Sequence, residues 1–154
     1  QTKYFDITAA VGKIYANGNY KYKITNASLN GKGTVTLVSV VKKTKTVVVP
    51  DTIKLGGKTF KVTAIGKAAF KKNVKVTKVT LGKNVKTIGA KSFAGCKSLK
   101  RVKLLTTQLT KAGTSAFNGI KSNATFALPK KYYNSYSKMI KKAGAPKKAE
   151  YKKF

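Results

Sequence analysis

The chain has 154 residues, of which 42% are hydrophobic, so a single domain with a modest core is expected. Lysine and arginine number 34 against three acids and no histidine, which gives a formal net charge of +31 at pH 7. This balance excludes widespread side-chain ion pairing. With no histidine, one cysteine and three scattered carboxylates, the usual general acids, general bases and metal clusters are excluded as well. We therefore expect a protein that is not an enzyme and that holds no metal or other cofactor.

The first part of the chain, residues 1–46, is predicted to be rich in β-strands. Turn-forming residues at 16–19 are followed by apolar residues that alternate with lysines over 20–24. Alternation with a period of two, next to a turn, is typical of a hairpin. We expect this hairpin to span residues 11–24.

Two further turns are predicted from glycines at 31 and at 56–57. Pro50 predicts that its strand lies at the edge of a sheet or ends there, because proline cannot donate a backbone hydrogen bond. The strands that these turns connect are predicted at 20–29 and 35–40, and at 52–55 and 59–62.

Three segments in the middle of the chain are copies of one pattern. Each places a glycine four residues before a phenylalanine, and Phe70, Phe93 and Phe117 recur at intervals of 23 and 24 residues. A period of this length predicts a solenoid, in which each unit buries its apolar face only by stacking on its neighbours. We therefore expect the three rings to occupy equivalent buried positions in one core.

Each unit is predicted to contain one short strand and one tight turn. The glycine before the phenylalanine is expected to ease the backbone into a helical or 3₁₀ turn. Further on, apolar residues alternate with other residues, as in a strand with one buried face. Six residues after the repeated phenylalanine, the first two units have an apolar residue, Val76 and Leu99, but the third has Asn123. The alternating pairs are Val79 and Leu81, Val102 and Leu104, and Phe126 and Leu128.

A helix is predicted between Pro129 and Gly144, because tyrosines and aliphatic residues recur there at helical spacing. These tyrosines either pack into the core or form a platform for stacking bases or sugar rings, and the spacing favours the core. The basic residues 147–154 either fray or add a last strand. The residues of the predicted apolar stripe are Tyr132, Tyr133, Tyr136, Met139 and Ile140.

The segment 85–104 resembles a BspA-like, or Treponema pallidum-type, leucine-rich repeat, and the resemblance extends over residues 47–129. It implies an α+β repeat fold: a short leucine-rich-repeat solenoid within a single domain, 1–154. Residues 1–46 would form an N-terminal β-hairpin cap and residues 130–154 a C-terminal helical cap and tail. The resemblance also implies a non-enzymatic bacterial module that is secreted or displayed on the cell surface.

The positive charge indicates a polyanionic partner such as a cell-wall polymer, an acidic glycan, nucleic acid or a membrane surface. All cations except Arg101 are lysine, which argues against sequence-specific reading of nucleic acid. No apolar run is long enough for a transmembrane segment. Because the sequence begins at Gln1 rather than Met, we expect a trimmed mature form or a fragment of a longer protein.

The predicted binding site lies on the exposed face of the stacked strands. Like charges on neighbouring strands destabilise a sheet, and a bound anion would relieve this repulsion. The alternative is a solvated cationic coat, since lysines also occur on the other faces of the repeats. The predicted ligand-binding residues are Lys78, Thr80, Arg101, Lys103 and Thr125, and Ala127 is expected on the same face.

Three functions remain open on the sequence alone. The first is an extracellular binding or adhesion module that contacts an anionic cell-wall polymer, an acidic glycan or a protein partner. The others are a nonspecific nucleic-acid-binding protein and a structural spacer within a larger surface protein. Cys96, the single cysteine, is expected to be a buried structural residue rather than a reactive thiol.

Overall fold

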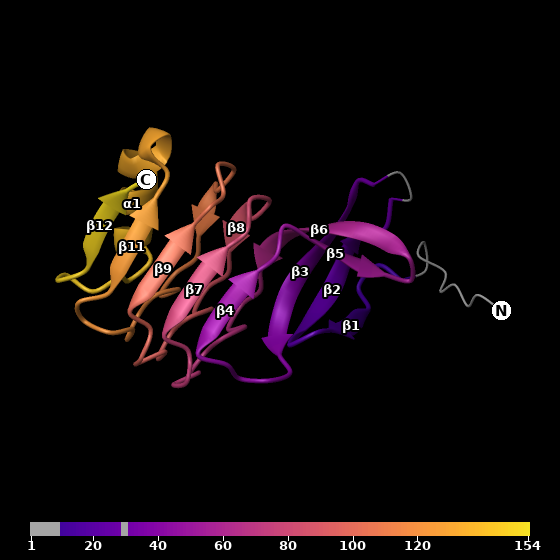
Figure 1. Cartoon of the computed structure of the whole chain (residues 1–154), viewed down its shortest axis with the longest axis horizontal. Coiled ribbons are helices and arrows are strands. Elements are labelled where there is room, and N and C mark those ends of the chain that lie inside the picture. The colour runs from indigo at the N-terminus through magenta and orange to yellow at the C-terminus, as the bar shows by residue number, and fades with distance from the viewer. Residues whose placement is uncertain (1–9, 29–30) are drawn as a thin grey trace.

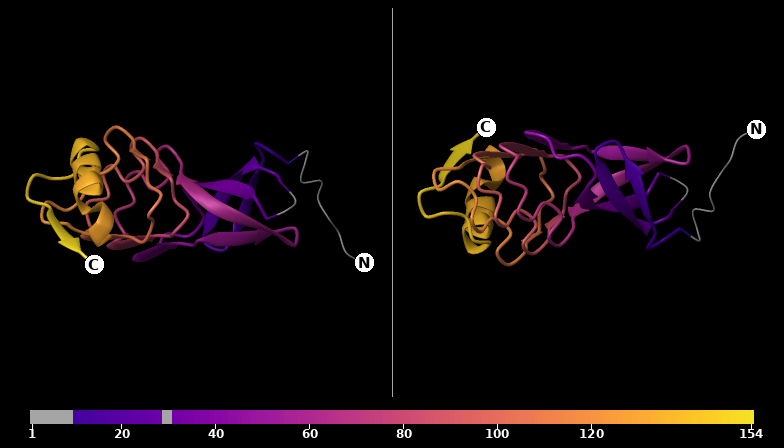
Figure 2. Two further views of the ribbon diagram at one scale, coloured as in Figure 1. Left: turned by 90° about the horizontal axis from the view of Figure 1, so that it is seen from above. Right: turned by 90° about the horizontal axis from the view of Figure 1, so that it is seen from below.

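The computed structural model describes residues 10–28 and 31–154, which form two sheets and one C-terminal helix (Figure 1). The five-stranded sheet is parallel and has the order β12-β11-β9-β7-β4. The seven-stranded sheet has the order β1-β2-β3-β6-β8-β10, with β5 paired to β6. The molecule is elongated, with the N-terminal strands at one end and the helix at the other (Figure 2).

The bounds of the strands and helices are given sheet by sheet. The seven-stranded sheet comprises β1 (Ile14–Asn17), β2 (Tyr20–Asn26), β3 (Gly33–Val40), β5 (Thr52–Leu55), β6 (Lys58–Ile65), β8 (Thr87–Ile88) and β10 (Lys111–Ala112). The five-stranded sheet comprises β4 (Thr46–Val49), β7 (Lys78–Leu81), β9 (Arg101–Leu104), β11 (Thr125–Leu128) and β12 (Glu150–Lys153). A 3₁₀ turn, η1 (Lys130–Tyr132), leads into α1 (Tyr133–Lys142).

The predicted N-terminal hairpin is confirmed. β1 and β2 pair antiparallel around Gly18, which has a φ of 60° and so adopts the left-handed conformation that glycine allows. β2 and β3 also pair antiparallel, as expected from the second turn, although Asn30 lies outside the described residues. Gly56 and Gly57 connect β5 to β6, as predicted.

The prediction made from Pro50 is also confirmed, because β4 ends at Val49 and is the last strand of its sheet. Backbone groups of β4 are nevertheless hydrogen-bonded to side chains. The Thr44 hydroxyl donates to the Thr46 carbonyl over 2.7 Å. The hydroxyl of Tyr20 is hydrogen-bonded to the Val48 backbone and to the Thr44 side chain. This strand edge therefore offers few free groups to another strand.

The three repeated phenylalanines occupy equivalent buried positions, as the period predicts. Phe70 and Phe93 stack at a centroid distance of 5.0 Å, and Phe93 and Phe117 at 5.6 Å, with interplanar angles of 5° and 1°. The row continues through edge contacts to Tyr20 at one end and to Phe126 at the other. Buried side chains from both sheets belong to the same continuous core.

The repeated glycines are required for close approach rather than for an unusual backbone conformation. A Cβ atom on Gly113 would lie 2.4 Å from the backbone nitrogen of Ala90, and one on Gly89 would lie 2.6 Å from the backbone of Gly66. Such distances are shorter than real Cβ contacts, so only glycine lets adjacent coils stack here. The expectation that glycine eases the turn therefore names the right residue but the wrong physical reason.

The positive-φ positions of the turns lie elsewhere in each unit. Two residues after each repeated phenylalanine the backbone is left-handed: Lys72 has a φ of 59°, Gly95 of 74° and Gly119 of 77°. Glycine adopts this conformation without a steric penalty, whereas lysine does not. The first repeat therefore carries strain at a position where the next two have none.

In the third repeat, Asn123 occupies a position that is apolar in the first two repeats, and a different residue is buried in its place. Val76 and Leu99 fill this position in the first two units and are fully buried. In the third unit Asn123 is exposed and the following residue, Ala124, is buried instead. A one-residue shift thus preserves the core without an apolar residue at position 123.

The helix α1 packs against the repeats through Tyr136 and Ile140, both of which are buried. The Tyr136 hydroxyl accepts a hydrogen bond of 3.1 Å from the backbone N–H of Leu109, a buried group 27 residues away. The predicted tyrosine stripe is therefore core, with Tyr132 and Tyr133 partly buried against it. Of the two outcomes open for the tail, the chain adds a last strand, β12, parallel to β11.

Candidate functional site

The exposed face of the five-stranded sheet carries the predicted site residues in neighbouring positions. Lys78 on β7 pairs in register with Arg101 on β9, which pairs with Thr125 on β11. In the next outward-facing row along the strands, Thr80 is the register partner of Lys103. Exposed or half-buried residues alternate with buried ones in all three strands. The expected adjacency of Lys78 and Arg101 is thus confirmed.

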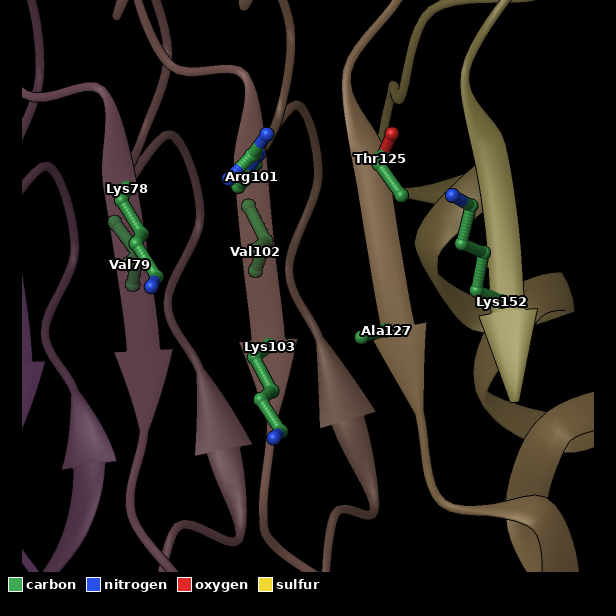
Figure 3. A pocket seen from close by; sticks show the side chains of 8 residues that line it. All are labelled: Lys78, Val79, Arg101, Val102, Lys103, Thr125, Ala127 and Lys152. Atoms are coloured by element: carbon green, nitrogen blue, oxygen red, sulfur yellow. The ribbon is translucent and has the colours of Figure 1, made fainter. Parts of the chain in front are cut away.

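Part of this face is hollowed into a groove of about 260 Å³ (Figure 3). Four of its lining residues are cations and none is an acid. Because the cations come from three different strands, their charges face one shared hollow. The polar and small residues that line the groove are Lys78, Arg101, Lys103, Thr125, Ala127 and Lys152.

The hollow exists because β11 carries short side chains between two strands with long ones. Thr125 and Ala127 are the outward residues of β11, whereas β9 presents Arg101 and Lys103, and β12 presents Lys152. In Figure 3 the Lys152 side chain points toward Thr125. Adjacent strands lie about 4.8 Å apart, so the two basic flanks are separated by about 10 Å. The result is a trough along β11.

The cations of the groove differ in their surroundings. The ammonium group of Lys103 lies 4.8 Å from the centroid of the Phe154 ring, within cation–π range. In Figure 3 the Lys103 side chain points away from Arg101. Within the described ranges, no such ring contact involves Lys78, Arg101 or Lys152. These three are therefore the cations best able to contact a ligand.

The polar residues that line the groove differ from the predicted set by one loss, Thr80, and one gain, Lys152. Thr80 lies on the same sheet face but does not line the groove. Lys152 lines it but was not predicted, because residues 147–154 could equally fray. The alternation of Glu150, Tyr151 and Lys152 is the signal that could have identified a last strand, with Tyr151 packed on the core and stacked on Phe126 at 5.4 Å.

One acid, Glu150, lies close to the groove without lining it. Its Cα pairs in register with Thr125, on the side opposite Arg101. The other described acid, Asp51, serves the backbone: its carboxylate accepts a 2.7 Å hydrogen bond from the N–H of Lys83. Of the acidic side chains in the described part of the chain, Glu150 is therefore the one that stands beside the trough.

Cys96 is fully buried, as expected for a structural residue. Its thiol donates to the carbonyl of Phe70 over 3.0 Å, and burial raises the pKa of Cys96 to about 11. At neutral pH the group is therefore a thiol rather than a nucleophilic thiolate.

Within residues 10–28 and 31–154, no three side chains of histidine, cysteine, aspartate or glutamate gather where a metal ion could be held. The helices of the same ranges are too short or too polar to cross a membrane.

Comparison with known proteins identifies the family. A model described as the BspA type leucine rich repeat region, with six copies, matches residues 63–143. The chain belongs to the BspA-type leucine-rich repeat family. The resemblance to this family is thereby confirmed, and the match covers residues 63–143, whereas the sequence resemblance spans 47–129. No curated protein matches the chain.

Solved structures with the same fold come from bacteria. A leucine-rich repeat protein of Bacteroides capillosus has a TM-score of 0.63 and 22% identity, over 90% of this chain and 97% of that protein. A leucine rich cell surface protein of Faecalibacterium prausnitzii has a TM-score of 0.59 and 23% identity, over 79% of this chain. This BspA-type chain covers 34% of the length of that second protein. The leucine rich repeat protein of T. pallidum has a TM-score of 0.58 and 18% identity, over 92% and 64% of the two chains. These similarities establish the fold.

Proposed function

We propose that this BspA-type chain is a non-enzymatic binding module whose strand face contacts anionic polymers outside the bacterial cell. The observation that carries the proposal is the groove on this face, which Lys78, Arg101 and Lys152 line together with the short side chains of β11 and which no acid lines. Such an arrangement lowers the energy of a bound anion and is costly when empty, because like charges on adjacent strands repel one another.

The family and the composition support a binding role over catalysis. Leucine-rich repeats are scaffolds whose ligands differ from protein to protein. The whole sequence has no histidine and only three acids, and Cys96 is buried as a thiol. An extracellular location is supported by the cell-surface name of the Faecalibacterium prausnitzii structure with the same fold.

We further propose that residues 1–154 act as one domain in which the repeats form a short solenoid. The repeats, 47–129, would otherwise expose the ends of their core to water. Buried side chains of β2 and β3 at one end and of α1 at the other belong to the same core, which supports caps within residues 1–46 and 130–154.

The test is a comparison of two triple variants with equal charge loss. In the groove variant Lys78, Arg101 and Lys152 become glutamine; in the control the exposed Lys67, Lys71 and Lys97 do. Binding to poly(glycerol phosphate) and to polygalacturonate is measured at physiological salt by calorimetry. The groove variant is expected to lose about tenfold or more in affinity, against about twofold for the control, because only contacts in the trough are specific.

Equal losses in the two variants would contradict the proposed site and favour a diffuse cationic coat. Charge-matched duplex DNA in the same assay examines the nucleic-acid alternative, since preferential binding of DNA would replace the cell-wall polymer as partner. A wild-type protein that binds none of these polymers at physiological salt would instead be a structural spacer.

A further inference from the structure

The only arginine of the chain lies at the centre of the groove. All other cations of the sequence are lysines, and Arg101 pairs in register with Lys78 on one side and with Thr125 on the other. Arginine presents a planar fork of donors that can hold two oxygens of one anion, whereas lysine provides a mobile point charge. The groove thus has one position suited to the shape of an anion as well as to its charge.

The neighbours of Arg101 add further donors around the same point. The Thr125 side chain lies on the floor of the trough, and the ammonium group of Lys152 points toward it from the opposite flank (Figure 3). Lys103 is held instead against the ring of Phe154. Glu150, the register partner of Thr125 on β12, does not line the groove, so the guanidinium, hydroxyl and ammonium groups are the polar groups that face the space above Thr125. Such a set suits a phosphate, whose oxygens point in several directions, better than a flat carboxylate.

The shape of the trough restricts the rest of the ligand. Its basic flanks on β9 and β12 are two strand spacings, or about 10 Å, apart, which admits one extended chain and not a double helix. No aromatic residue lines it, so it lacks the rings on which single-stranded nucleic acids stack their bases. A phosphodiester chain without bases satisfies both restrictions.

We infer that the trough along β11 selects single phosphodiester chains without bases, and that Arg101 is its specificity-determining residue. This inference rests on the proposed function and adds a ligand class to it. One phosphate of the chain lies over Thr125 between Arg101 and Lys152, and the polymer follows the direction of β11. Polymers of equal charge that carry carboxylates, or phosphates with bases, bind more weakly.

The test uses substitutions that preserve charge. Arg101→Lys keeps the charge but removes the fork, and Lys97→Arg is the control at an exposed position outside the groove. Arg101→Lys is expected to weaken the binding of poly(glycerol phosphate) about fivefold or more, and Lys97→Arg to leave it unchanged. Thr125→Val, which removes only the hydroxyl, is expected to weaken the same binding about threefold.

The wild-type protein is assayed in parallel with poly(glycerol phosphate), polygalacturonate and single-stranded oligonucleotide of matched charge, and preference for the first supports the inference. Equal or stronger binding of either other polymer overturns it, as does wild-type affinity of Arg101→Lys for poly(glycerol phosphate). In these cases the proposed function still stands if the triple groove variant loses affinity. A wild-type protein that binds no polyanion overturns both, as do equal losses of affinity in the groove and control triple variants.

Discussion

The inner turns of the repeats and their exposed strand face differ in how strictly the residues repeat. On the inner side Gly89 and Gly113 approach neighbouring backbone, and each phenylalanine stacks on the next ring. On the strand face, Lys78, Arg101 and Thr125 occupy equivalent register positions but differ in charge and size. Positions that contact another coil must therefore repeat, whereas positions that contact solvent are free to specialise.

The largest effect on stability is expected on the inner side, at the middle ring of the stack. Phe93→Ala removes a fully buried ring that contacts a phenylalanine on each side, and it should lower the free energy of unfolding by about 3–5 kcal/mol. Chemical denaturation measures the loss. Phe154→Ala is the control, because Phe154 is 52% exposed and should cost less than about 1 kcal/mol. Similar losses in the two variants would contradict the shared core.

A single methyl group at a repeated glycine is expected to be almost as damaging. Gly113→Ala would place its Cβ 2.4 Å from a backbone atom, so adjacent coils must separate, at a cost of about 3 kcal/mol. Gly57→Ala separates this effect from backbone strain, since Gly57 has a positive φ but no atom within 4 Å of its Cβ position. If thermal unfolding shows Gly57→Ala to be the more harmful change, close approach is not the reason for the repeated glycines.

Weakening the contact between α1 and the repeats is expected to cause a smaller loss in the free energy of unfolding. Tyr136→Phe leaves the buried N–H of Leu109 without its hydroxyl acceptor and should cost about 1–2 kcal/mol. Tyr132→Phe, in the 3₁₀ turn just before α1 and only partly buried, is expected to be near neutral. Denaturation midpoints compare the two variants, and a neutral Tyr136→Phe would show that this hydrogen bond does not anchor the helix.

The smallest effect is expected to be stabilising. Lys72 is left-handed where the next two repeats have Gly95 and Gly119, so Lys72→Gly should relieve strain and raise the free energy of unfolding by about 0.5–1 kcal/mol. Lys71→Gly, next to it, has no positive φ to relieve and should be destabilising. A loss of stability in both variants would indicate that the turn accommodates lysine without strain.

The features that follow from the period could be predicted from the sequence. The recurrence of Phe70, Phe93 and Phe117 predicts the stack, and the alternation in each unit predicts that Lys78 and Arg101 are neighbours. Both depend on regular spacing, which a repeat imposes on the chain. The hairpin and the helix follow from turn residues and apolar spacing in the same way.

The features that depend on contacts between different parts of the fold could not be predicted. The trough requires Lys152 from a tail that forms a strand beside β11, with Tyr151 stacked on Phe126. Lys103 turns toward Phe154, which is distant in the sequence. The role of Gly113 depends on its distance to Ala90 in the adjacent coil, and such a close approach leaves no local signature in the sequence.

The bonded edge of β4 bears on how the protein behaves at high concentration. A bare strand edge can template the growth of fibrils from other chains. Here the carbonyl of Thr46 and the backbone of Val48 are already engaged by side-chain hydroxyl groups. At the opposite edge, Lys152 and Lys153 place charge on β12. We therefore expect the protein to resist amyloid-like assembly even in concentrated salt, where charge repulsion is screened but the hydrogen bonds at β4 persist.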